Sequence, residues 1–565
     1  MKYGPITEFS DNLHYEKYRL KNETFVCSMN RIASDSANGG KHFSVINDIL
    51  KNMYFLPAGR IQSTLGSPQQ TTPFNCFVSG KITDSFVDGY GSIMHRATEA
   101  AKTMRMGGGI GYDFSTLRPN GAIIKKIRSD SSGPTSFIDI FNSVGKCISS
   151  SGHRRGAQLA ALNIGHPDIE EYINVKQNTH MLTNFNLSVS VTDEFMNSLI
   201  QNKPFFDLKF NNIVYAQVNP KKLWEMLMRS CYDWGEPGIL FVDTINRMNN
   251  LKYCEDIRTT NPCGEQPLPP FGACLLGSFN LVKYIKYVDK MVVFDYKMLI
   301  SHIKPIVMMF DNIISTARYP LLAHEVEATT KRRMGLGITG LANSAEFLGF
   351  KYGSDEFMVF LRKILQILRN ESYKASIDLA IEKGAFPMYE REKYISSEFI
   401  KTLPEKIQND IYENGIRNSH LTCIAPTGTI SLCADNISSG IEPVFQHETL
   451  RNVKLKSGNH KFILKDYAYN FFGLKGMLAG NVPIKDHINI LSESQRNVDG
   501  AVSKTCNINA SLGWEEFKDI YITAWKNGCK GCTVFNSDGK RKGIFNETEG
   551  RGCSIDKKTG VKDCE

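Results

Sequence analysis

Strand-like stretches of the sequence alternate with helix-like ones from about residue 60 to residue 530. Residues 185–191 alternate apolar and polar side chains, and residues 238–242 and 421–425 are short apolar runs. Ser354 can cap a long amphipathic helix. Such alternation predicts parallel strands joined by crossover helices, and therefore an α/β fold with a large buried core.

Composition narrows the class of protein. Of the 565 residues, 42% are hydrophobic and 22% are charged, which argues against global disorder. The net charge of +9 is dispersed, without a basic block, so we expect no nucleic-acid partner. No apolar run approaches the ~18 residues that a membrane helix needs, and the first eleven residues lack a secretory signal. We therefore expect no membrane association and a cytoplasmic location.

Fourteen cysteines are many for a reducing compartment, where they would not serve as a disulfide framework. Several stand among glycines, prolines and polar residues, where packing alone explains them poorly. We expect some of them to be catalytic or metal-bound.

The segment Thr-Asn-Pro-Cys-Gly-Glu-Gln-Pro-Leu-Pro-Pro at residues 260–270 is too rich in proline for a helix or a central strand. An extended backbone would project Asn261, Cys263 and Glu265 to one side. The amide can orient hydroxyls, the carboxylate can accept a proton, and the thiol can act as a nucleophile or carry a radical. A proline-stiffened surface loop with a chance cysteine and glutamate stays open as the alternative.

This segment, together with Cys274 in Cys-Leu-Leu-Gly-Ser-Phe-Asn-Leu, resembles the active-site loop of ribonucleotide reductases, in its class II (adenosylcobalamin-dependent) form. The resemblance implies that Cys263 becomes a transient thiyl radical and removes the 3′-hydrogen of a ribose. It also implies that Glu265 deprotonates the 3′-hydroxyl and that Asn261 hydrogen-bonds the ribose hydroxyls. Cys76 and Cys274 would supply two electrons by forming a disulfide.

The resemblance covers about residues 5–540 and implies a ten-stranded α/β barrel. Two parallel five-stranded halves would surround a central finger loop that carries Cys263. We expect a helical N-terminal segment at residues 1–60 without an ATP-cone domain, the barrel at residues 61–540, and a flexible C-terminal redox tail at residues 541–565. On–off control by ATP and dATP is not expected, whereas base selection can persist.

Residues 425–431, Ala-Pro-Thr-Gly-Thr-Ile-Ser, follow a strand-like run and open a helix. Backbone N–H groups and hydroxyls at such a turn favour an anion, although an ordinary helix cap explains the motif about as well. The resemblance implies that this loop binds the substrate phosphates through Thr427, Gly428, Thr429, Ile430 and Ser431.

The resemblance also implies a deoxynucleoside triphosphate effector that selects the base to be reduced. The matching residues are Asp84 and Ser85 for the effector sugar, and Arg154, Arg155 and Gln158 on a loop between effector and substrate base. Arginine and glutamine side chains suit a base or a phosphate. A solvated basic loop is the plain alternative.

Two glycine-rich motifs do not predict nucleotide binding by themselves. Residues 107–111 lack the Lys-Ser/Thr of a P-loop, and close backbone packing explains them at least as well as a ligand. The Gly-x-Gly-x-x-Gly at residues 335–340 follows three basic residues rather than an apolar strand, so we reject a dinucleotide site there.

The radical source follows from the resemblance and from elimination. The chain has no Tyr-Tyr dipeptide, as a class I relay requires, and no Arg-Val-Cys-Gly-Tyr segment, as a glycyl-radical enzyme requires. Adenosylcobalamin is therefore the predicted cofactor. The family's C-terminal cysteines shuttle electrons, and Cys553 and Cys564 match that role, with a thioredoxin or glutaredoxin-type protein as reductant.

Cys529-x-x-Cys532 has the spacing of a half zinc site but lacks a twin. We expect a structural role there and no metal. The predicted function is the reduction of ribonucleotide di- or triphosphates to 2′-deoxyribonucleotides, with a homodimer left open. The alternatives are a class I-type catalytic subunit that needs a separate radical-generating subunit, and a non-catalytic nucleotide-binding protein.

Overall fold

The computed structural model describes residues 3–37, 40, 42–124, 128–150, 157–178, 181–455, 458–508, 512–536, 540, 554–555 and 562–563. Four residues of predicted function lie outside these ranges, namely Arg154, Arg155, Cys553 and Cys564.

The N-terminal segment is mainly helical, as predicted, and is anchored to a distant part of the chain. Thr7 and Thr24 cap the first two helices, each hydroxyl accepting the N–H three residues on. Asp435 accepts the backbone N–H groups of Ile6 (2.9 Å) and Thr7 (2.8 Å). The elements are α1 (Glu8–Tyr18), α2 (Phe25–Ser36), α3 (Phe43–Lys51), β1 (Phe55–Pro57) and α4 (Gly59–Thr64).

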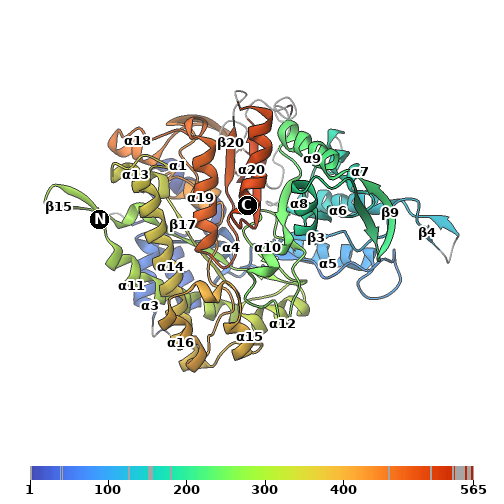
Figure 1. The fold of residues 1–565 in the computed structure, drawn as a ribbon. Helices are drawn as coiled ribbons and strands as arrows, with labels where there is room; N and C mark the ends of the chain where they lie inside the picture. Colours follow the sequence, from blue (N-terminus) through green and yellow to red (C-terminus); the bar gives the residue numbers. More distant parts are fainter. Residues whose placement is uncertain are drawn as a thin grey trace.

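Five strands pair in parallel in the order β2–β3–β6–β7–β10. They are β2 (Cys76–Val78), β3 (Gly109–Asp113), β6 (Gln158–Asn163), β7 (Phe185–Val191) and β10 (Gly238–Phe241). The strands predicted at residues 185–191 and 238–242 are confirmed. Figure 1 shows this group and its helices on the right. The helices are α5 (Ile93–Arg105), α6 (Gly133–Ser150), α7 (Ile169–Asn174), α8 (Asp193–Ile200) and α9 (Pro220–Trp234).

A second group of strands completes the interior. Its members are β13 (Ala273–Cys274), β14 (Leu276–Asn280), β17 (Gly335–Thr339), β20 (Thr505–Ile508) and β21 (Gly531–Asn536). The β14–β17 and β20–β21 pairs are parallel. Single parallel bridges join Leu336 to Thr422 and Ile424 to Val502. The predicted strand at residues 421–425 therefore lies between β17 and the segment before β20 with only one bridge on each side.

Two antiparallel pairs, β10–β21 and β13–β2, connect the groups. Among the described residues the sheets are an eight-stranded one, ordered β13–β2–β3–β6–β7–β10–β21–β20, and a three-stranded one, ordered β1–β14–β17. The ladder is interrupted at Leu275 and at the single bridges of residues 421–425. The structure is thus a mixed α/β fold, and its described residues do not form one closed ten-stranded ring.

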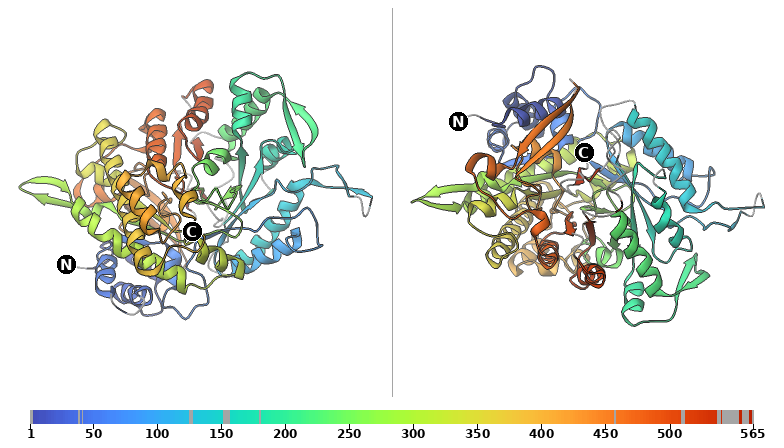
Figure 2. Two further views of the ribbon diagram at one scale, coloured as in Figure 1. Left: turned by 60° about the horizontal axis from the view of Figure 1, so that its bottom comes forward. Right: turned by 90° about the horizontal axis from the view of Figure 1, so that it is seen from above.

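Helices cover the outside of the strands. Ser354 caps the longest helix, α14, by accepting the N–H of Phe357 (3.3 Å), as predicted. Figure 2 shows the N-terminal helices on the side of the yellow and orange helices, away from the cyan strands. The remaining helices are α10 (Val242–Arg247), α11 (Tyr296–Thr316), α12 (Leu322–Lys331), α13 (Leu341–Phe347), α14 (Asp355–Lys383), α15 (Arg391–Ile395), α16 (Glu405–Asn414), α17 (Gly428–Cys433), α18 (Tyr467–Phe472), α19 (Ile484–Arg496) and α20 (Trp514–Lys526).

Short antiparallel pairs decorate the surface. They are β4 (Ile123–Ile124) with β5 (Ser129–Asp130), β8 (Phe206–Phe210) with β9 (Ile213–Val218), β15 (Ile285–Val288) with β16 (Met291–Phe294), β18 (Glu448–Leu455) with β19 (Gly458–Lys465), and β22 (Ser554–Ile555) with β23 (Lys562–Asp563).

Helix α11 is the one helix of the described chain that is long and apolar enough to cross a membrane by length and composition. Its most apolar window is 61% buried, as in the core helix of a folded domain. The helix also carries a buried acid, Asp311, which is 1% exposed.

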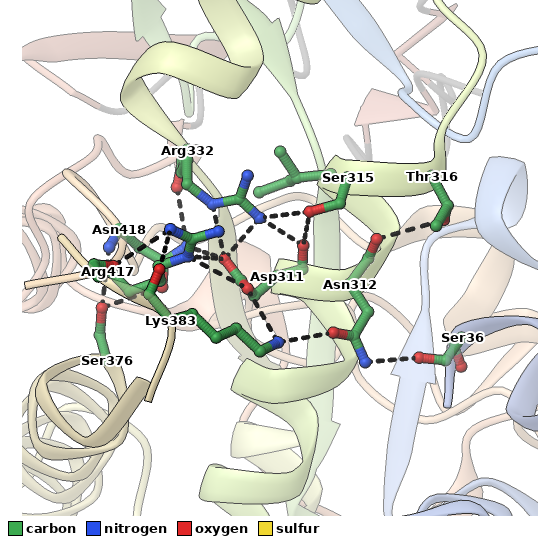
Figure 3. A network of polar contacts seen from close by, with 12 residues as sticks. Ser36, Asp311, Asn312, Ser315, Thr316, Arg332, Ser376, Lys383, Arg417 and Asn418 are labelled. Carbon is green, nitrogen blue, oxygen red and sulfur yellow. Dashed lines mark hydrogen bonds and ion pairs between the residues drawn. The ribbon is translucent and has the colours of Figure 1, made fainter. Parts of the chain in front are cut away.

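Asp311 is the centre of a buried polar network that joins α11 to the ends of α12 and α14 (Figure 3). Arg332 donates Nε to its carboxylate (2.8 Å), and Asn418 donates its amide (3.2 Å). Lys383 Nζ lies 3.3 Å and Arg417 Nε 3.4 Å from the same carboxylate. One acid therefore forms ion pairs with cations from three separate segments of the chain.

We expect Asp311→Ala to lower the free energy of unfolding by about 3–5 kcal/mol, because it leaves buried cations without their counter-charge. Guanidinium unfolding followed by circular dichroism measures the change. Asp378→Ala is the control, since the Asp378–Lys304 pair (2.6 Å) is half exposed and should contribute less than about 1 kcal/mol. Equal losses in the two variants would contradict a special role for Asp311.

Candidate active site

The proline-rich segment forms a finger whose tip is a tight turn. Strands β11 (Thr259–Thr260) and β12 (Pro267–Leu268) pair below the tip. The Asn261 N–H donates to the Gln266 carbonyl (3.1 Å), and Asn261 Oδ1 accepts the Gln266 N–H (2.9 Å). Gly264 has φ +86°, which costs little without a Cβ. The extended tip that we predicted is wrong, since Asn261 folds back to hold the turn while Cys263 and Glu265 project from it.

Glycines on the surrounding strands provide the space that the finger occupies. A Cβ on Gly111 would lie 1.8 Å from the Thr260 carbonyl oxygen, and one on Gly335 would lie 2.4 Å from Gln266 Nε2. A Cβ on Gly337 would lie 2.6 Å from the carbonyl oxygen of Cys423. The sequence left two interpretations of residues 107–111 open, close backbone packing and a ligand contact. At Gly111 the structure shows close packing.

The two cysteines predicted to supply electrons are neighbours. Cys76 on β2 and Cys274 on β13 are direct partners in an antiparallel pair. Directly opposite residues have Cβ atoms about 4.5–5.5 Å apart, close to the ~3.5–4.5 Å of a disulfide. Neither cysteine is in a disulfide in the described part of the chain. A disulfide between them therefore needs little movement.

The thiol cluster is shielded from water. Cys274 is 2% exposed, Cys263 5% and Glu265 1%. Burial raises the pKa of Cys274 well above its usual value, and the charges of Cys76 and Glu265 raise it further. Cys274 therefore stays protonated and keeps the hydrogen that a reducing thiol must deliver.

A cavity of about 60 Å³ lies over the finger tip. Cys263 and Glu265 line it from the finger, and Cys76 lines it from β2. Thr427 and Thr429 line it from the predicted phosphate loop. The structure thus brings the predicted catalytic and phosphate-binding segments to one cavity, whereas Asn261 is fully buried beside it, with Nδ2 lacking a partner among the described residues.

Hydroxyl groups fix the predicted phosphate loop. Thr427 has φ +54°, and its Oγ1 contacts Thr339 Oγ1 (2.9 Å) and Ser431 Oγ (3.0 Å) and accepts the Gly440 N–H (2.7 Å). The hydroxyls of Thr427 and Ser431 therefore hold the loop together. Ile430 lines the cavity over the finger, whereas Gly428 lines a neighbouring one.

Cys263 also lines a second cavity of about 60 Å³. Its other walls come mainly from β7, β10, β21 and residues 502–504, and none comes from the phosphate loop. Asn186 on β7 lines it and donates its amide to the Pro262 carbonyl (3.3 Å). Cys263 therefore borders both cavities.

The predicted effector residues are only partly placed. Asp84 pairs with Arg118 (2.9 Å), an arginine that sequence reasoning missed, and Ser85 Oγ accepts the N–H of Asp88 (3.1 Å). The side chains of Asp84 and Arg118 are 29% and 27% exposed, and Asp84 lines a cavity of about 880 Å³. Arg154 and Arg155 lie outside the described residues.

Gln158 does not suit the role predicted for it. The side chain is 1% exposed, accepts the hydroxyl of Tyr112 (3.0 Å) and donates to the carbonyl of Phe141 (3.1 Å). Since both polar groups are already bonded inside the core, this residue is not available to read a nucleotide.

Cys529 and Cys532 are buried, and Cys532 pairs with Ile239 of β10 within the apolar layer under the helices. The described residues contain no group of three or more His, Cys, Asp or Glu side chains suited to a metal ion. The tail cysteines Cys553 and Cys564 lie outside the described residues.

Ser278 was also missed, although it belongs to the Leu-Gly-Ser motif that carries the resemblance. It follows Cys274 by four residues, and the period of two in a strand places both on one face. Ser278 lines the cavity over the finger. The even spacing between Cys274 and Ser278 was therefore the sequence signal that could have identified Ser278.

Comparison with known proteins agrees with this geometry. Residues 75–470 and 477–535 match the ribonucleotide reductase barrel domain. A protein of Mycobacterium tuberculosis (strain CDC 1551 / Oshkosh), named vitamin B12-dependent ribonucleoside-diphosphate reductase, is 32% identical over 88% of this chain and 72% of its own length. A protein of the same name from Thermoplasma acidophilum is 31% identical over 92% and 68%. A Chlamydia pneumoniae protein named ribonucleoside-diphosphate reductase subunit alpha is 26% identical over 77% and 49%.

The matched residues include the finger, both strands of the cysteine pair and the phosphate loop, and they span most of the sequence. The chain belongs to the ribonucleotide reductase family.

Proposed function

We propose that this chain reduces ribonucleotides to 2′-deoxyribonucleotides with adenosylcobalamin as its radical source. One observation carries the proposal: Cys263 lines two cavities, and one of them also contains Cys76, Glu265 and the loop of residues 425–430. Relatives named as vitamin B12-dependent ribonucleoside-diphosphate reductases favour diphosphate substrates.

Each residue has a distinct role. A thiyl radical at Cys263 removes the 3′-hydrogen and later returns it, while Glu265 accepts the 3′-hydroxyl proton. The bond from C2′ to its hydroxyl breaks, and the hydroxyl leaves as water. Cys76 and Cys274 deliver two protons and two electrons and become a disulfide. The Asn261 amide hydrogen-bonds the ribose, and backbone groups of residues 427–430 bind the phosphates.

Residues that line the second cavity would hold the adenosyl end of the cofactor beside Cys263. Asn186, Ser188 and Thr533 offer polar groups there, and a Cβ on Gly264 would meet nothing within 4 Å, so the finger leaves this side open. When bound, adenosylcobalamin supplies the one-electron chemistry that converts a thiol into a thiyl radical. The protein's part is to hold the Cys263 Sγ between this cavity and the substrate.

The proposal extends to the fold. The parallel ladder β2–β3–β6–β7–β10 is one five-stranded half. The other half consists of β13 with β14, β17, residues 421–425, β20 and β21. The antiparallel β13–β2 and β10–β21 pairs and the two bridges at Thr422 and Ile424 support a ten-stranded barrel around the finger.

Regulation and electron supply complete the proposal. A deoxynucleoside triphosphate effector binds at Asp84 and Ser85, with Arg118, Arg154 and Arg155 as partners for its phosphates and base. Cys553 and Cys564 pass electrons from a thioredoxin or glutaredoxin-type protein to the active-site disulfide. We expect the chain to work in the cytoplasm, and a homodimer is left open.

One assay decides between this proposal and its alternatives. Purified chain, CDP and a dithiol should yield dCDP only when adenosylcobalamin is added. Activity only after addition of a second, radical-generating subunit would establish the class I alternative. CDP binding without turnover under either condition would establish a non-catalytic nucleotide-binding protein.

We expect Cys263→Ser to abolish dCDP formation, because a serine hydroxyl does not form the radical, while CDP binding by calorimetry stays within about twofold of the original. Cys27→Ser, at an exposed cysteine of α2, is the control and should keep full turnover. Turnover by the Cys263→Ser chain would refute the radical role.

Changing Cys553 and Cys564 together to serine should spare the first turnover, since Cys76 and Cys274 still hold two electrons. It should block cycling fed by thioredoxin and leave cycling fed by a small dithiol. Rapid-quench and steady-state dCDP yields measure the two. Unimpaired thioredoxin cycling would rule out the tail as the shuttle.

A further inference from the structure

Ser278, which lines the cavity over the finger, has a buried hydroxyl without a hydrogen-bond partner among the described residues. The residue is 1% exposed and lines the cavity together with Cys263 and Glu265. A buried hydroxyl without a partner is costly and rare in folded proteins, which points to a ligand atom that completes it.

Strand register gives the height of Ser278 in the cavity. Ser278 and Asn280 share one face of β14, and steps of two residues along a strand are about 6.6 Å. Asn280 is the partner of Thr339, whose hydroxyl contacts Thr427 of the phosphate loop (2.9 Å). Ser278 therefore stands about 7 Å from the level of the phosphate loop along β14, and Cys274 of β13 lies four residues away in the opposite direction, beyond the interruption at Leu275.

The neighbouring strand places no side chain over this hydroxyl. Ser278 is the register partner of Gly337 on β17, and a Cβ on that glycine would lie 3.4 Å from Ser278 Oγ and 2.6 Å from the Cys423 carbonyl oxygen. A larger residue at position 337 would therefore press against both oxygen atoms.

A second buried oxygen beside the cavity also lacks a hydrogen-bond partner among the described residues. Asn75 Oδ1 is buried, has no hydrogen-bond partner among the described residues, and its residue lines the same cavity. A carbonyl oxygen can only accept a hydrogen bond. Phosphate groups at neutral pH offer few donors, whereas the hydroxyls of a sugar are donors.

We propose that Ser278 is a further substrate-binding residue whose hydroxyl hydrogen-bonds the sugar of the bound nucleotide, with Asn75 Oδ1 as a second acceptor for the same sugar. The inference rests on the proposed function and adds to it. Ser278 lies between the segment that binds phosphates and the sulfur atoms that react, which is where the sugar of a nucleotide must lie.

The test uses two probes that differ by the sugar and base, CDP and inorganic pyrophosphate. Both are titrated into the full chain without adenosylcobalamin, so that no turnover occurs. Ser278→Ala should weaken CDP binding about tenfold, through loss of one buried hydrogen bond, and leave pyrophosphate binding unchanged. Asn75→Ala should act in the same direction, and it keeps the test decisive if Ser278→Ala does not fold, as judged by its melting temperature.

Two control variants bracket the result. Thr429→Ala, in the phosphate loop, should weaken both probes, and Ser301→Ala, at an exposed serine of α11, should weaken neither. Equal weakening of CDP and pyrophosphate by Ser278→Ala would mean that it acts through the phosphate loop and would overturn the inference, as would no effect on CDP. If the unsubstituted chain binds neither probe, the proposed function itself fails.

Discussion

The contact between the finger and β3 fixes the geometry of everything around it. The Thr260 carbonyl approaches Gly111 so closely that no other residue fits there without displacement. Asn186 holds the Pro262 carbonyl from one side (3.3 Å), and the Ala501 N–H holds the Glu265 carbonyl from the other (2.9 Å). With its backbone fixed at these points, the tip can present one sulfur atom and one carboxylate without relying on side-chain flexibility.

The burial of this site follows from its chemistry. A thiol that carries or donates a hydrogen atom must stay protonated and away from water and oxidants, and burial of Cys274 has that effect on its pKa. Polar groups beside it on Asn75 and Ser278 have no partner among the described residues, which destabilises the fold unless a ligand completes them as we propose. Pre-arranged groups of this kind favour binding over stability.

Local patterns in the sequence predicted β7, β10, α14 and the helical N-terminal segment, because period and capping are properties of neighbouring residues. They could not predict that Cys76 and Cys274 meet, since that depends on pairing across two hundred residues; the family resemblance supplied it. For Gln158 the family resemblance predicted the wrong role. Gln158 lies opposite Ile110 of β3, whose side chain faces the helices. Side chains alternate between the two faces of a strand, so a shift of one residue in register would reverse the face on which each side chain lies.

The finger tip and the phosphate loop show a further limit of pattern. The period of two failed at Asn261 because Gly264 takes a left-handed conformation and turns the chain back on itself. Thr427 and Ser431 looked like ligands from their chemistry, yet their hydroxyls bond to each other and to Thr339. In both places tertiary hydrogen bonds, which no local window contains, decided the outcome.

The position of the Cys76–Cys274 pair has a mechanical consequence. These cysteines face each other across one of the two seams at which the groups of strands meet, the antiparallel pair of β2 and β13. When both cysteines are thiols, β2 and β13 are joined by non-covalent contacts. When they are oxidised, a disulfide links the two strands covalently. The rigidity of this seam would then rise and fall with every round of electron transfer.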